Sequence, residues 1–436
     1  MKSYHIITFG CQMNEHDSER MAGILRQQEY VQSADAVSAD IIILNTCSIR
    51  EKAEQKFYSE LGRLRNLKLE RPGVTIAVAG CIAQQEGKKI LARAPHVDMI
   101  FGPSDVARVS ELSGFADTWR APLVEIDGDP DYHLKQIPTL RHDQLKAWVS
   151  IMYGCDNFCT YCIVPYLRGR ERSRPPEDIT AEVQGLAERG FKEVTLLGQN
   201  VNSYGRGMQS TMRFPALLGM VNAVEGIERI RFVTSHPRDL SQELIYAIRD
   251  LPKVCESLHL PVQSGADPVL SAMNRRYTRA EYLDQVKRLR DAVPAITFTT
   301  DIIVGFPGET EHDFEMTLKL LREVEYDGLF AFKYSKRPGT AALKLTDHIP
   351  EKIKESRLAG VLDLQKMITR KKNAAYAGTT VEVLVDGHSK KGGMLTGRMR
   401  GNKSVNFDGP DSLIGTLAVV RIIAAGENSL NGELCV

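Results

Sequence analysis

Three cysteines stand close together in the segment GCDNFCTYC, residues 154–162. Cys155, Cys159 and Cys162 have the spacing C-x3-C-x2-C. Three thiolates this close can bind three irons of an iron–sulfur cube and leave the fourth iron without a protein ligand. An open iron suits chemistry rather than plain electron transfer, because a small molecule can bind to it. Structural zinc is the alternative, but tetrahedral zinc takes four ligands and no fourth Cys or His lies nearby.

Three further cysteines follow strand-like segments in the first part of the chain. Apolar runs rich in Ile and Val alternate there with amphipathic helical patterns, which predicts a doubly wound parallel sheet. The runs are residues 5–10, 40–46, 75–80 and 97–102. Cys11, Cys47 and Cys81 come directly after the first three. Because parallel strands end at one shared edge, we expect these thiols to meet and hold a second cluster. Three buried, inert cysteines are the alternative.

Residues 141–371 repeat the strand–helix theme about six times. The first of these strands runs into the cysteine segment at residue 154. Six units predict a partial (β/α)6 barrel, open on one side for a large substrate, with its chemistry at the carboxyl ends of the strands. Polar groups follow the predicted strands at Gln199, Asn200, Ser235, His236, Gln263, Ser264 and Gly305 to Glu309. For His236 and His259, a structural role and a role in the site both remain open.

Two stretches carry a local excess of positive charge. Arginines at 168, 170, 172 and 174 follow the cysteine segment, where they are expected to bind phosphate or pair with carboxylates; a helix-entry surface is the alternative. Residues 374–436 have short strand-like runs typical of a small five-stranded barrel that holds single-stranded nucleic acid. The second basic stretch lies in this region, between His388 and Asn406, where the sequence has no acidic residue. Its basic residues are Lys390, Lys391, Arg398, Arg400 and Lys403. It suits a phosphate backbone, or is a solvated surface.

A helix is predicted over residues 350–373, and its basic end, TRKKN, is either a helix terminus matched to the macrodipole or an RNA contact. Residues 121–140 carry acids and prolines without periodicity, and we interpret them as a linker.

The chain has 436 residues, of which 43% are hydrophobic and 25% charged, and a net charge of +1. This composition is typical of a globular protein with two or three domains, and nucleic acid would have to bind a local patch. No apolar run could span a bilayer, and the amino terminus lacks the shape of a signal peptide. We therefore expect a cytoplasmic protein without membrane contact, whose cysteines are metal ligands or thiols rather than disulfides.

Five segments resemble the methylthiotransferase family of radical S-adenosylmethionine (SAM) enzymes. They are GCQMNEHDSE (10–19), NTCSIREKAEQK (45–56), AGC (79–81), GCDNFCTYCIVPYLRGRERSRP (154–175) and LLGQNVNSYG (196–205). The resemblance covers nearly the whole chain in the family's order: a methylthiotransferase domain (1–120), a radical SAM core (141–371) and a TRAM RNA-binding domain (374–436). The QMN after Cys11 and the YLRGRERSR favour the tRNA-2-methylthio-N6-dimethylallyladenosine synthase branch. Sister branches act on threonylcarbamoyladenosine of tRNA or on an aspartate of a ribosomal protein.

The resemblance implies two [4Fe–4S] clusters and SAM. The loop cysteines (Cys155, Cys159 and Cys162) would hold the cluster that binds SAM. The sheet-edge cysteines (Cys11, Cys47 and Cys81) would hold an auxiliary cluster that carries or donates sulfur. Reductive cleavage of SAM would give a 5′-deoxyadenosyl radical that takes hydrogen from C2 of an isopentenylated adenosine beside the anticodon, and a second SAM would supply the methyl group. C2 has no acidic proton, so the chemistry belongs to the cofactors and no side chain is assigned as catalytic.

Strand-end position and resemblance together predict the residues that contact SAM: Tyr161, Gln199, Asn200 and Gln263. The implied partners are the anticodon stem-loop of tRNA and an electron donor such as flavodoxin, and we expect a monomer. The TRAM domain and the Arg168–Arg174 stretch are expected to grip phosphates around the anticodon loop. An iron–sulfur scaffold or RNA-binding protein without catalysis is the alternative from another class; it predicts no cleavage of SAM.

Overall fold

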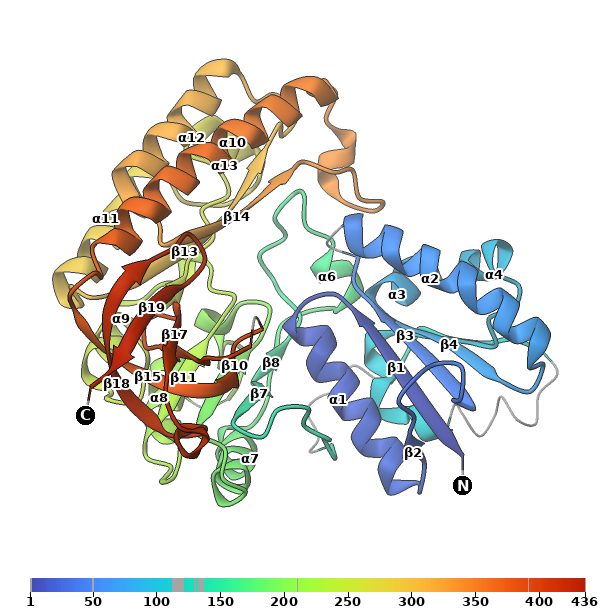
Figure 1. Cartoon of the computed structure of the whole chain (residues 1–436). Coiled ribbons are helices and arrows are strands. Elements are labelled where there is room, and N and C mark those ends of the chain that lie inside the picture. Colours follow the sequence, from blue (N-terminus) through green and yellow to red (C-terminus); the bar gives the residue numbers. More distant parts are fainter. Residues whose placement is uncertain are drawn as a thin grey trace.

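Figure 1 shows the computed structural model, which describes residues 2–48, 51–111, 121–128, 131, 137–209, 211–390 and 392–435. A parallel sheet at the amino terminus, a larger α/β core and a small carboxyl-terminal barrel follow one another along the chain, as predicted from the sequence. Among the described residues, no helix is both long enough and apolar enough to cross a membrane.

The first sheet has the strand order β2-β1-β3-β4-β5-β6, with all pairs parallel. Its strands are β1 (Ser3–Phe9), β2 (Val31–Gln32), β3 (Ile41–Thr46), β4 (Thr75–Gly80), β5 (Met99–Phe101) and β6 (Leu123–Glu125). Every residue of β3 and β4 is buried, because helices cover both faces of a parallel sheet. On one face lies α1 (Gln12–Gln27), packed through Met21 and Leu25. On the other lies α2 (Glu51–Glu70), packed through Phe57 and Leu61.

The other helices that the structure describes in this region are short: α3 (Cys81–Glu86), α4 (Lys89–Arg93) and the 3-10 turn η1 (Pro103–Arg108). One expectation was wrong here. Leu123–Glu125 forms β6, paired with β5 at the edge of the sheet, although residues 121–140 were interpreted as a linker. Acids and prolines flank this short strand and dominated the pattern of the segment. Residues 129–130 and 132–136 of that segment lie outside the described residues.

The α/β core contains the six strands expected from the sequence, in two parallel sheets within the described residues, β11-β10-β7 and β12-β13-β14. Their bounds are β7 (Lys146–Ser150), β10 (Glu193–Leu197), β11 (Arg229–Phe232), β12 (Ser257–His259), β13 (Thr297–Val304) and β14 (Gly328–Lys333). The short strands β8 (Met152–Tyr153) and β9 (Arg172–Ser173) pair with each other. The two sheets share one apolar core with the helices, as expected of a partial barrel.

The core helices lie between consecutive strands. They are α6 (Val164–Leu167), α7 (Pro176–Glu188), α8 (Phe214–Asn222), α9 (Gln242–Asp250), α10 (Asp267–Ala272), α11 (Arg279–Ala292), α12 (Glu311–Val324) and α13 (Glu351–Ala374), with 3-10 turns η3 (Val201–Ser203), η4 (Pro237–Asp239) and η5 (Ala341–Lys344). The expected inward faces are buried, for example Ile179 and Val183 of α7 and Phe314 of α12. Thr278 and Thr310 cap α11 and α12 with capping boxes, which fixes where these helices begin.

Side chains alternate between two faces along the second sheet. Residues that pack with the helices are Leu258, Phe298, Ile302 and Val304. The other face is the inner face of the open barrel, where Asp301 lies beside Phe330 and Ile303 beside Phe332. Phe330 and Phe332 are 55% and 38% exposed. The inner face therefore carries two exposed aromatic rings in its last described strand.

Strands β15 (Thr380–His388), β16 (Leu395–Met399), β17 (Ser404–Asp408), β18 (Leu417–Ala425) and β19 (Leu430–Leu434) form a closed barrel, with the turn η6 (Asp411–Leu413) before β18. This is the small barrel predicted for the carboxyl-terminal region. It packs against the first core sheet, where Arg231 of β11 donates to the carbonyl oxygens of Met399 and Arg400 at 3.0 and 2.8 Å. The small barrel thus lies at the amino-terminal ends of the core strands.

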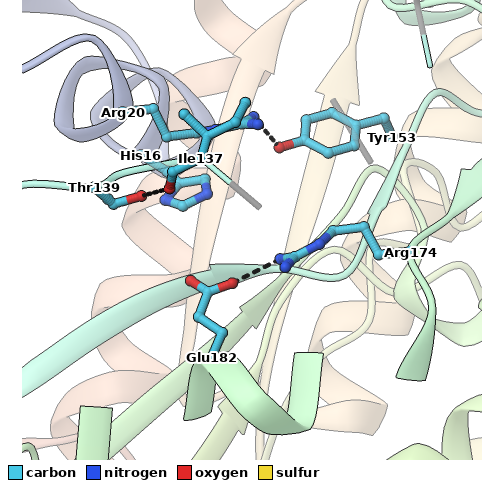
Figure 2. Close-up of a pocket in the computed structure, with 7 residues that line it drawn as sticks. All are labelled: His16, Arg20, Ile137, Thr139, Tyr153, Arg174 and Glu182. Carbon is cyan, nitrogen blue, oxygen red and sulfur yellow. Dashed lines mark hydrogen bonds and ion pairs between the residues drawn. The ribbon is translucent and has the colours of Figure 1, made fainter. Parts of the chain in front are cut away.

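A polar seam joins the first sheet to the core. Figure 2 shows Arg20 of α1 directed at Tyr153 and Arg174 paired with Glu182, around a cavity of about 10 Å³ that has room for one water molecule. Arg141 reaches the seam as well, and its Nη1 lies 2.9 Å from the Glu19 carboxylate. Helix α1 therefore buries charged residues on the side that faces the core, which fixes the position of Cys11 relative to the core.

Candidate metal and cofactor site

The loop cysteines lie between β8 and α6. Their loop contacts the turn that follows α10, residues 273–276, which we call the α10 turn. The amide of Thr160 donates to the carbonyl oxygen of Met273 at 3.0 Å, and the Asn274 side chain donates to the carbonyl oxygen of Phe158 at 3.0 Å. Phe158 adopts a left-handed φ of +47°, which turns the chain between the first two cysteines. Contacts with residues 272–274, including the bond from the Thr160 hydroxyl to the Ala272 carbonyl oxygen at 2.8 Å, therefore hold the loop in shape.

The three loop thiols face one another closely enough to interact electrostatically. Burial raises the pKa of Cys155 to about 11 and that of Cys162 to about 12, and the neighbouring Cys159 sulfur adds to both shifts. Backbone amides of Asn157 and Val164 oppose the shifts by donating toward these sulfurs. Amide donors around thiolates are typical of iron–sulfur ligation. Since the thiols hold their protons tightly, binding a cluster here would release protons.

Arg275 supplies the positive charge at the loop cysteines. Its Nη1 lies 3.4 Å from the Cys159 sulfur and 3.4 Å from the Tyr161 hydroxyl, while Nη2 donates to the Pro261 carbonyl oxygen at 2.6 Å. His236 approaches the same sulfur, with Nε2 at 4.0 Å. Burial, together with the Arg275 charge, lowers the pKa of His236 to about 2, so this ring is neutral. Arg275 has no sequence motif of its own, and pattern reasoning did not find it.

The sheet-edge cysteines are brought together as expected, because β1, β3 and β4 are neighbours in the sheet. A hydrogen bond from the Cys47 side chain lowers the pKa of Cys11 to about 6, and burial raises the pKa of Cys81. Two glycines permit the close approach. A Cβ on Gly10 would lie 2.7 Å from that of Cys47, and one on Gly80 would lie 2.5 Å from the Thr46 carbonyl oxygen.

Asn14 and Asn45 hold this edge in register. The Asn14 side chain accepts a hydrogen bond from the Cys11 thiol at 3.4 Å and donates to the carbonyl oxygen of Thr46 at 3.0 Å. Asn45 donates to the backbone oxygen of Asn14 at 2.8 Å. Both amides are buried; Asn14 ends the QMN motif that follows Cys11, and Asn45 begins the NTC motif that ends at Cys47. The motifs therefore mark positioning residues as well as thiols.

The two cysteine sets fit iron–sulfur clusters by the chemistry of their donors. Among the described residues, no three His, Cys, Asp or Glu side chains are already spaced to bind a single metal ion. A cubane does not require such spacing, because each cysteine binds a different iron. The loop and the sheet edge each offer three thiols, one for each of three irons, with amide and guanidinium donors around them. The ligand roles themselves stay predictions.

The residues expected to contact SAM lie at the carboxyl ends of the core strands and offer buried polar atoms. Both amide atoms of Gln199, Oδ1 of Asn200 and Oε1 of Gln263 are buried without a hydrogen-bond partner among the described residues. Leaving such atoms unpaired costs about 1–3 kcal/mol each, so a polar molecule bound beside them would restore what is lost. Tyr161 packs beside Phe306 of the GFPGE turn, and its hydroxyl lies near Arg275.

Hydrogen bonds to Glu309 hold the GFPGE turn (residues 305–309) in place. The Glu309 carboxylate accepts from the amide of Gly305 at 2.6 Å and from Arg357 of α13, also at 2.6 Å. Gly305 adopts a φ of +69°, and a Cβ there would lie 2.4 Å from the Lys354 side chain. The turn is thus preformed at the end of β13, and Arg357 is a supporting residue that sequence reasoning missed.

The expectation of phosphate binding by the arginine stretch was wrong for two of its members. Arg168 pairs with Asp17 at 2.8 Å, and Arg174 pairs with Glu182 at 2.8 Å, with all four side chains mostly or fully buried. Carboxylate pairing, the other expectation, describes both. Arg170 and Arg172 lie nearer the surface, and Arg170 pairs with Asp156 at 2.9 Å. The two buried arginines are the ones that meet a carboxylate of a neighbouring helix, Asp17 of α1 and Glu182 of α7.

Basic residues of the carboxyl-terminal region are also used within the chain. Arg400 pairs with Glu256 at 2.7 Å, and Lys403 lies 3.2 Å from Asp327, so both attach the small barrel to the core. Lys372, in the TRKKN end of α13, shares Asp327 at 2.7 Å. Lys390 is exposed, and Lys391 lies outside the described residues. A nucleic-acid surface on this barrel would therefore be smaller than the sequence suggested.

We expect replacement of Arg275 by methionine to lower the free energy of unfolding by about 3 kcal/mol, because it leaves buried partners of the guanidinium unpaired. We also expect the reconstituted protein to lose iron from the loop cysteines. Iron content and thermal unfolding measure both effects. The exposed neighbour Arg276, replaced in the same way, is the control and should change neither. Equal effects of the two substitutions would contradict the role given to Arg275.

Three family profiles match the chain in order. A profile described as "Uncharacterized protein family UPF0004" matches residues 3–102. The radical SAM superfamily matches residues 149–321, and the TRAM domain matches residues 374–435. The second match covers the loop cysteines, and the first covers all three sheet-edge cysteines. The radical SAM match implies a [4Fe–4S] cluster and SAM for this chain.

Relatives named "tRNA-2-methylthio-N(6)-dimethylallyladenosine synthase" match over the full length. The protein of Caldicellulosiruptor saccharolyticus is 49% identical over 99% of this chain and 92% of its own length. That of Geotalea uraniireducens is 49% identical over 100% and 99%. Among solved structures, the radical SAM methyltransferase TsrM of Kitasatospora setae, with cobalamin and a [4Fe–4S] cluster bound, has a TM-score of 0.58. It is 12% identical and covers 78% of this chain and 77% of its own, a likeness of fold alone.

Proposed function

The chain belongs to the family of tRNA-2-methylthio-N(6)-dimethylallyladenosine synthases, and from this premise we propose how its residues serve the reaction. It is a radical SAM tRNA methylthiotransferase that adds a methylthio group to C2 of N6-isopentenyladenosine next to the anticodon. The observation that carries this conclusion is the full-length match, which spans both cysteine sets. It supports the branch predicted from QMN and YLRGRERSR over the sister branches.

Cys155, Cys159 and Cys162 are the ligands of the [4Fe–4S] cluster to which SAM binds. When bound, the cluster and SAM supply a radical that removes hydrogen from a carbon without an acidic proton. The protein's own residues bind, orient and shield. Arg275 balances the thiolate charge, and its bond to the Pro261 carbonyl oxygen ties the cluster loop to the segment after β12.

Gln199, Asn200 and Gln263 orient SAM through the buried amide atoms that lack partners among the described residues. Asn200 is the best fixed of the three, because its Nδ2 donates to Asp239 at 2.7 Å and leaves Oδ1 directed elsewhere. The Tyr161 hydroxyl, near Arg275, completes the set. The chain's part in the reaction is therefore to hold the cofactor still and to exclude water.

Cys11, Cys47 and Cys81 hold a second [4Fe–4S] cluster, which serves as the sulfur carrier. Support comes from the placement of the three thiols at one sheet edge and from the amide network of Asn14 and Asn45 around them. A noncatalytic iron–sulfur scaffold would not need an open iron at each of two clusters. An enzyme that adds sulfur to carbon needs both, because the sulfur and the radical must reach the same carbon.

The substrate base enters the inner face of the open barrel. Phe330 and Phe332 are exposed there, and bases of single-stranded RNA stack on aromatic rings. A splayed anticodon loop offers unstacked bases at modest cost. The rings support base binding, while Lys390 and Arg170 remain near the surface for phosphates.

We expect Phe330→Ala and Phe332→Ala each to raise the KM for isopentenylated tRNA about tenfold, since stacking contributes about 1–3 kcal/mol per base. SAM cleavage without tRNA should be unchanged. Tyr246→Ala is the matched control, because Tyr246 is also exposed (44%) but lies on α9, outside the barrel. If all three variants raise KM equally, or none does, the inner face is not where the base binds.

Other features of the proposal follow from the family and from the sequence. The domains are residues 1–120, 141–371 and 374–436, with the segment 121–140 between the first two. The chain works as a monomer in the cytoplasm, where tRNA is modified, and takes electrons from a donor such as flavodoxin. The anticodon stem-loop is its macromolecular partner.

A strain that lacks its own enzyme of this type tests the proposed function. We expect its tRNA to contain isopentenyladenosine and to regain 2-methylthio-isopentenyladenosine when this chain is expressed. A chain with Cys11→Ala is the inactive control. Restoration of a methylthio group on threonylcarbamoyladenosine, or on a ribosomal-protein aspartate, would favour a sister branch instead.

A further inference from the structure

The segment from Cys162 to Arg168 joins the two cysteine sets. It leaves the cluster loop at Cys162 and forms the short helix α6 (Val164–Leu167). Ile163 and Leu167 pack against Cys81 in one small apolar cluster. Figure 1 shows α6 between the core strands and α3, the helix that begins at Cys81. One short segment therefore contacts both proposed clusters' ligands.

Arg168 ends this segment in a buried ion pair with the first domain. Its Nη2 lies 2.8 Å from Oδ2 of Asp17, and the two side chains are 5% and 0% exposed. Asp17 belongs to α1, the helix that begins directly after Cys11. Burying two charges is costly, and apolar residues of similar size would pack as stably. The pair therefore points to a role besides holding the domains together.

Half of this ion pair has no hydrogen-bond partner in the part of the chain that the structure describes. Nη1 of Arg168 and Oδ1 of Asp17 are buried and make no hydrogen bond among the described residues. The guanidinium lies close to the sheet-edge thiols, because Leu167 before it packs with Cys81 and its partner Asp17 lies on α1, which begins directly after Cys11. An unused donor and a fixed cation thus stand beside the sheet-edge cysteines.

We propose that Arg168 is a positioning residue that the radical SAM core supplies to the sheet-edge site, donating from Nη1 to a sulfur of the cluster held there. With Asp17 it sets the reduction potential of that cluster. The inference rests on the proposed function, since it requires a cluster on Cys11, Cys47 and Cys81. A neighbouring cation, or a hydrogen bond to sulfur, stabilises the more negative, reduced state of an iron–sulfur cluster.

The test uses the full-length chain with Cys155, Cys159 and Cys162 replaced by alanine, reconstituted with iron and sulfide so that only the sheet-edge cluster is present. A redox titration followed by electron paramagnetic resonance measures its midpoint potential. We expect Arg168→Gln to lower the potential and Asp17→Asn to raise it. The double variant should return toward the starting value, because the two changes in charge cancel. Arg168→Lys keeps the charge and should fall between Arg168→Gln and the starting chain.

Arg141→Gln is the matched control. Arg141 also forms a buried ion pair with α1, through Glu19, with side chains 2% and 5% exposed. Its loss should lower thermal stability and leave the potential unchanged. Shifts of one sign in both Arg168→Gln and Asp17→Asn, or an equal shift in Arg141→Gln, would overturn the inference. If Arg168→Gln fails to fold, a rise in Asp17→Asn alone supports it and an unchanged potential overturns it. A starting chain without iron would overturn the proposed second cluster, and this inference with it.

Discussion

Replacing Cys155, Cys159 and Cys162 together by alanine will lower the iron content of the reconstituted chain from about eight to about four atoms and abolish cleavage of SAM. The loop thiols are the cysteines within residues 149–321 that show the C-x3-C-x2-C spacing, and their loop is shaped by contacts to the α10 turn rather than by metal. The protein should therefore stay folded while losing one cluster. Iron and sulfide analysis, with detection of cleaved SAM, measures both effects.

Cys255→Ala is the control for this experiment, because Cys255 is buried and lies in neither cysteine set. It should keep about eight irons and full cleavage of SAM. About four irons in the unaltered chain would contradict the second cluster. Retained SAM cleavage in the triple variant would contradict the role of the loop cysteines.

Gly154→Ala will remove the loop cluster without touching a thiol. Gly154 precedes Cys155 at a φ of +75°, and a Cβ there would lie 2.0 Å from the backbone oxygen of Arg170. Backbone atoms cannot yield as a flexible side chain can, so the chain must open between β8 and β9. We expect iron to fall to about four atoms and SAM cleavage to fall to background.

Gly169→Ala separates the clash from the backbone strain. Gly169 has a similar φ of +77°, but nothing lies within 4 Å of the position of its Cβ. This substitution should cost about 1–2 kcal/mol for the left-handed conformation and leave both clusters in place. Thermal unfolding and iron content compare the two variants. If Gly169→Ala loses as much iron as Gly154→Ala, strain and not the close approach explains the effect.

The fold could be predicted from the sequence where periodicity was long enough. The buried runs of β3 and β4, the six core strands and the carboxyl-terminal barrel all have patterns of five or more residues or repeat in a regular order. Strand β6 was missed because acids and prolines surround it, whereas the apolar runs that contain the equally short β5 and β12 extend beyond those strands. Positions of the cysteines followed from the strands, because a residue after a parallel strand must lie at the shared edge.

Partners of charged residues could not be predicted, since they depend on how distant segments meet. The sequence shows Arg168, Arg174, Arg400 and Lys403 as positive charge beside a proposed reaction centre or on a hairpin. In the structure each meets a carboxylate from another element, such as Asp17 or Glu256. Arg275 carried no motif at all, and its contact with Cys159 arises only when the α10 turn folds onto the cluster loop. Local patterns do not encode such long-range pairs.

The central claim is that this chain adds a methylthio group to an isopentenylated adenosine of tRNA. The most direct measurement is mass spectrometry of nucleosides after anaerobic incubation of the reconstituted protein with SAM, a reductant and isopentenylated tRNA. We predict the appearance of 2-methylthio-N6-isopentenyladenosine with matching loss of N6-isopentenyladenosine. Unchanged N6-isopentenyladenosine, in a reaction where SAM is cleaved and both clusters are present, would contradict the claim.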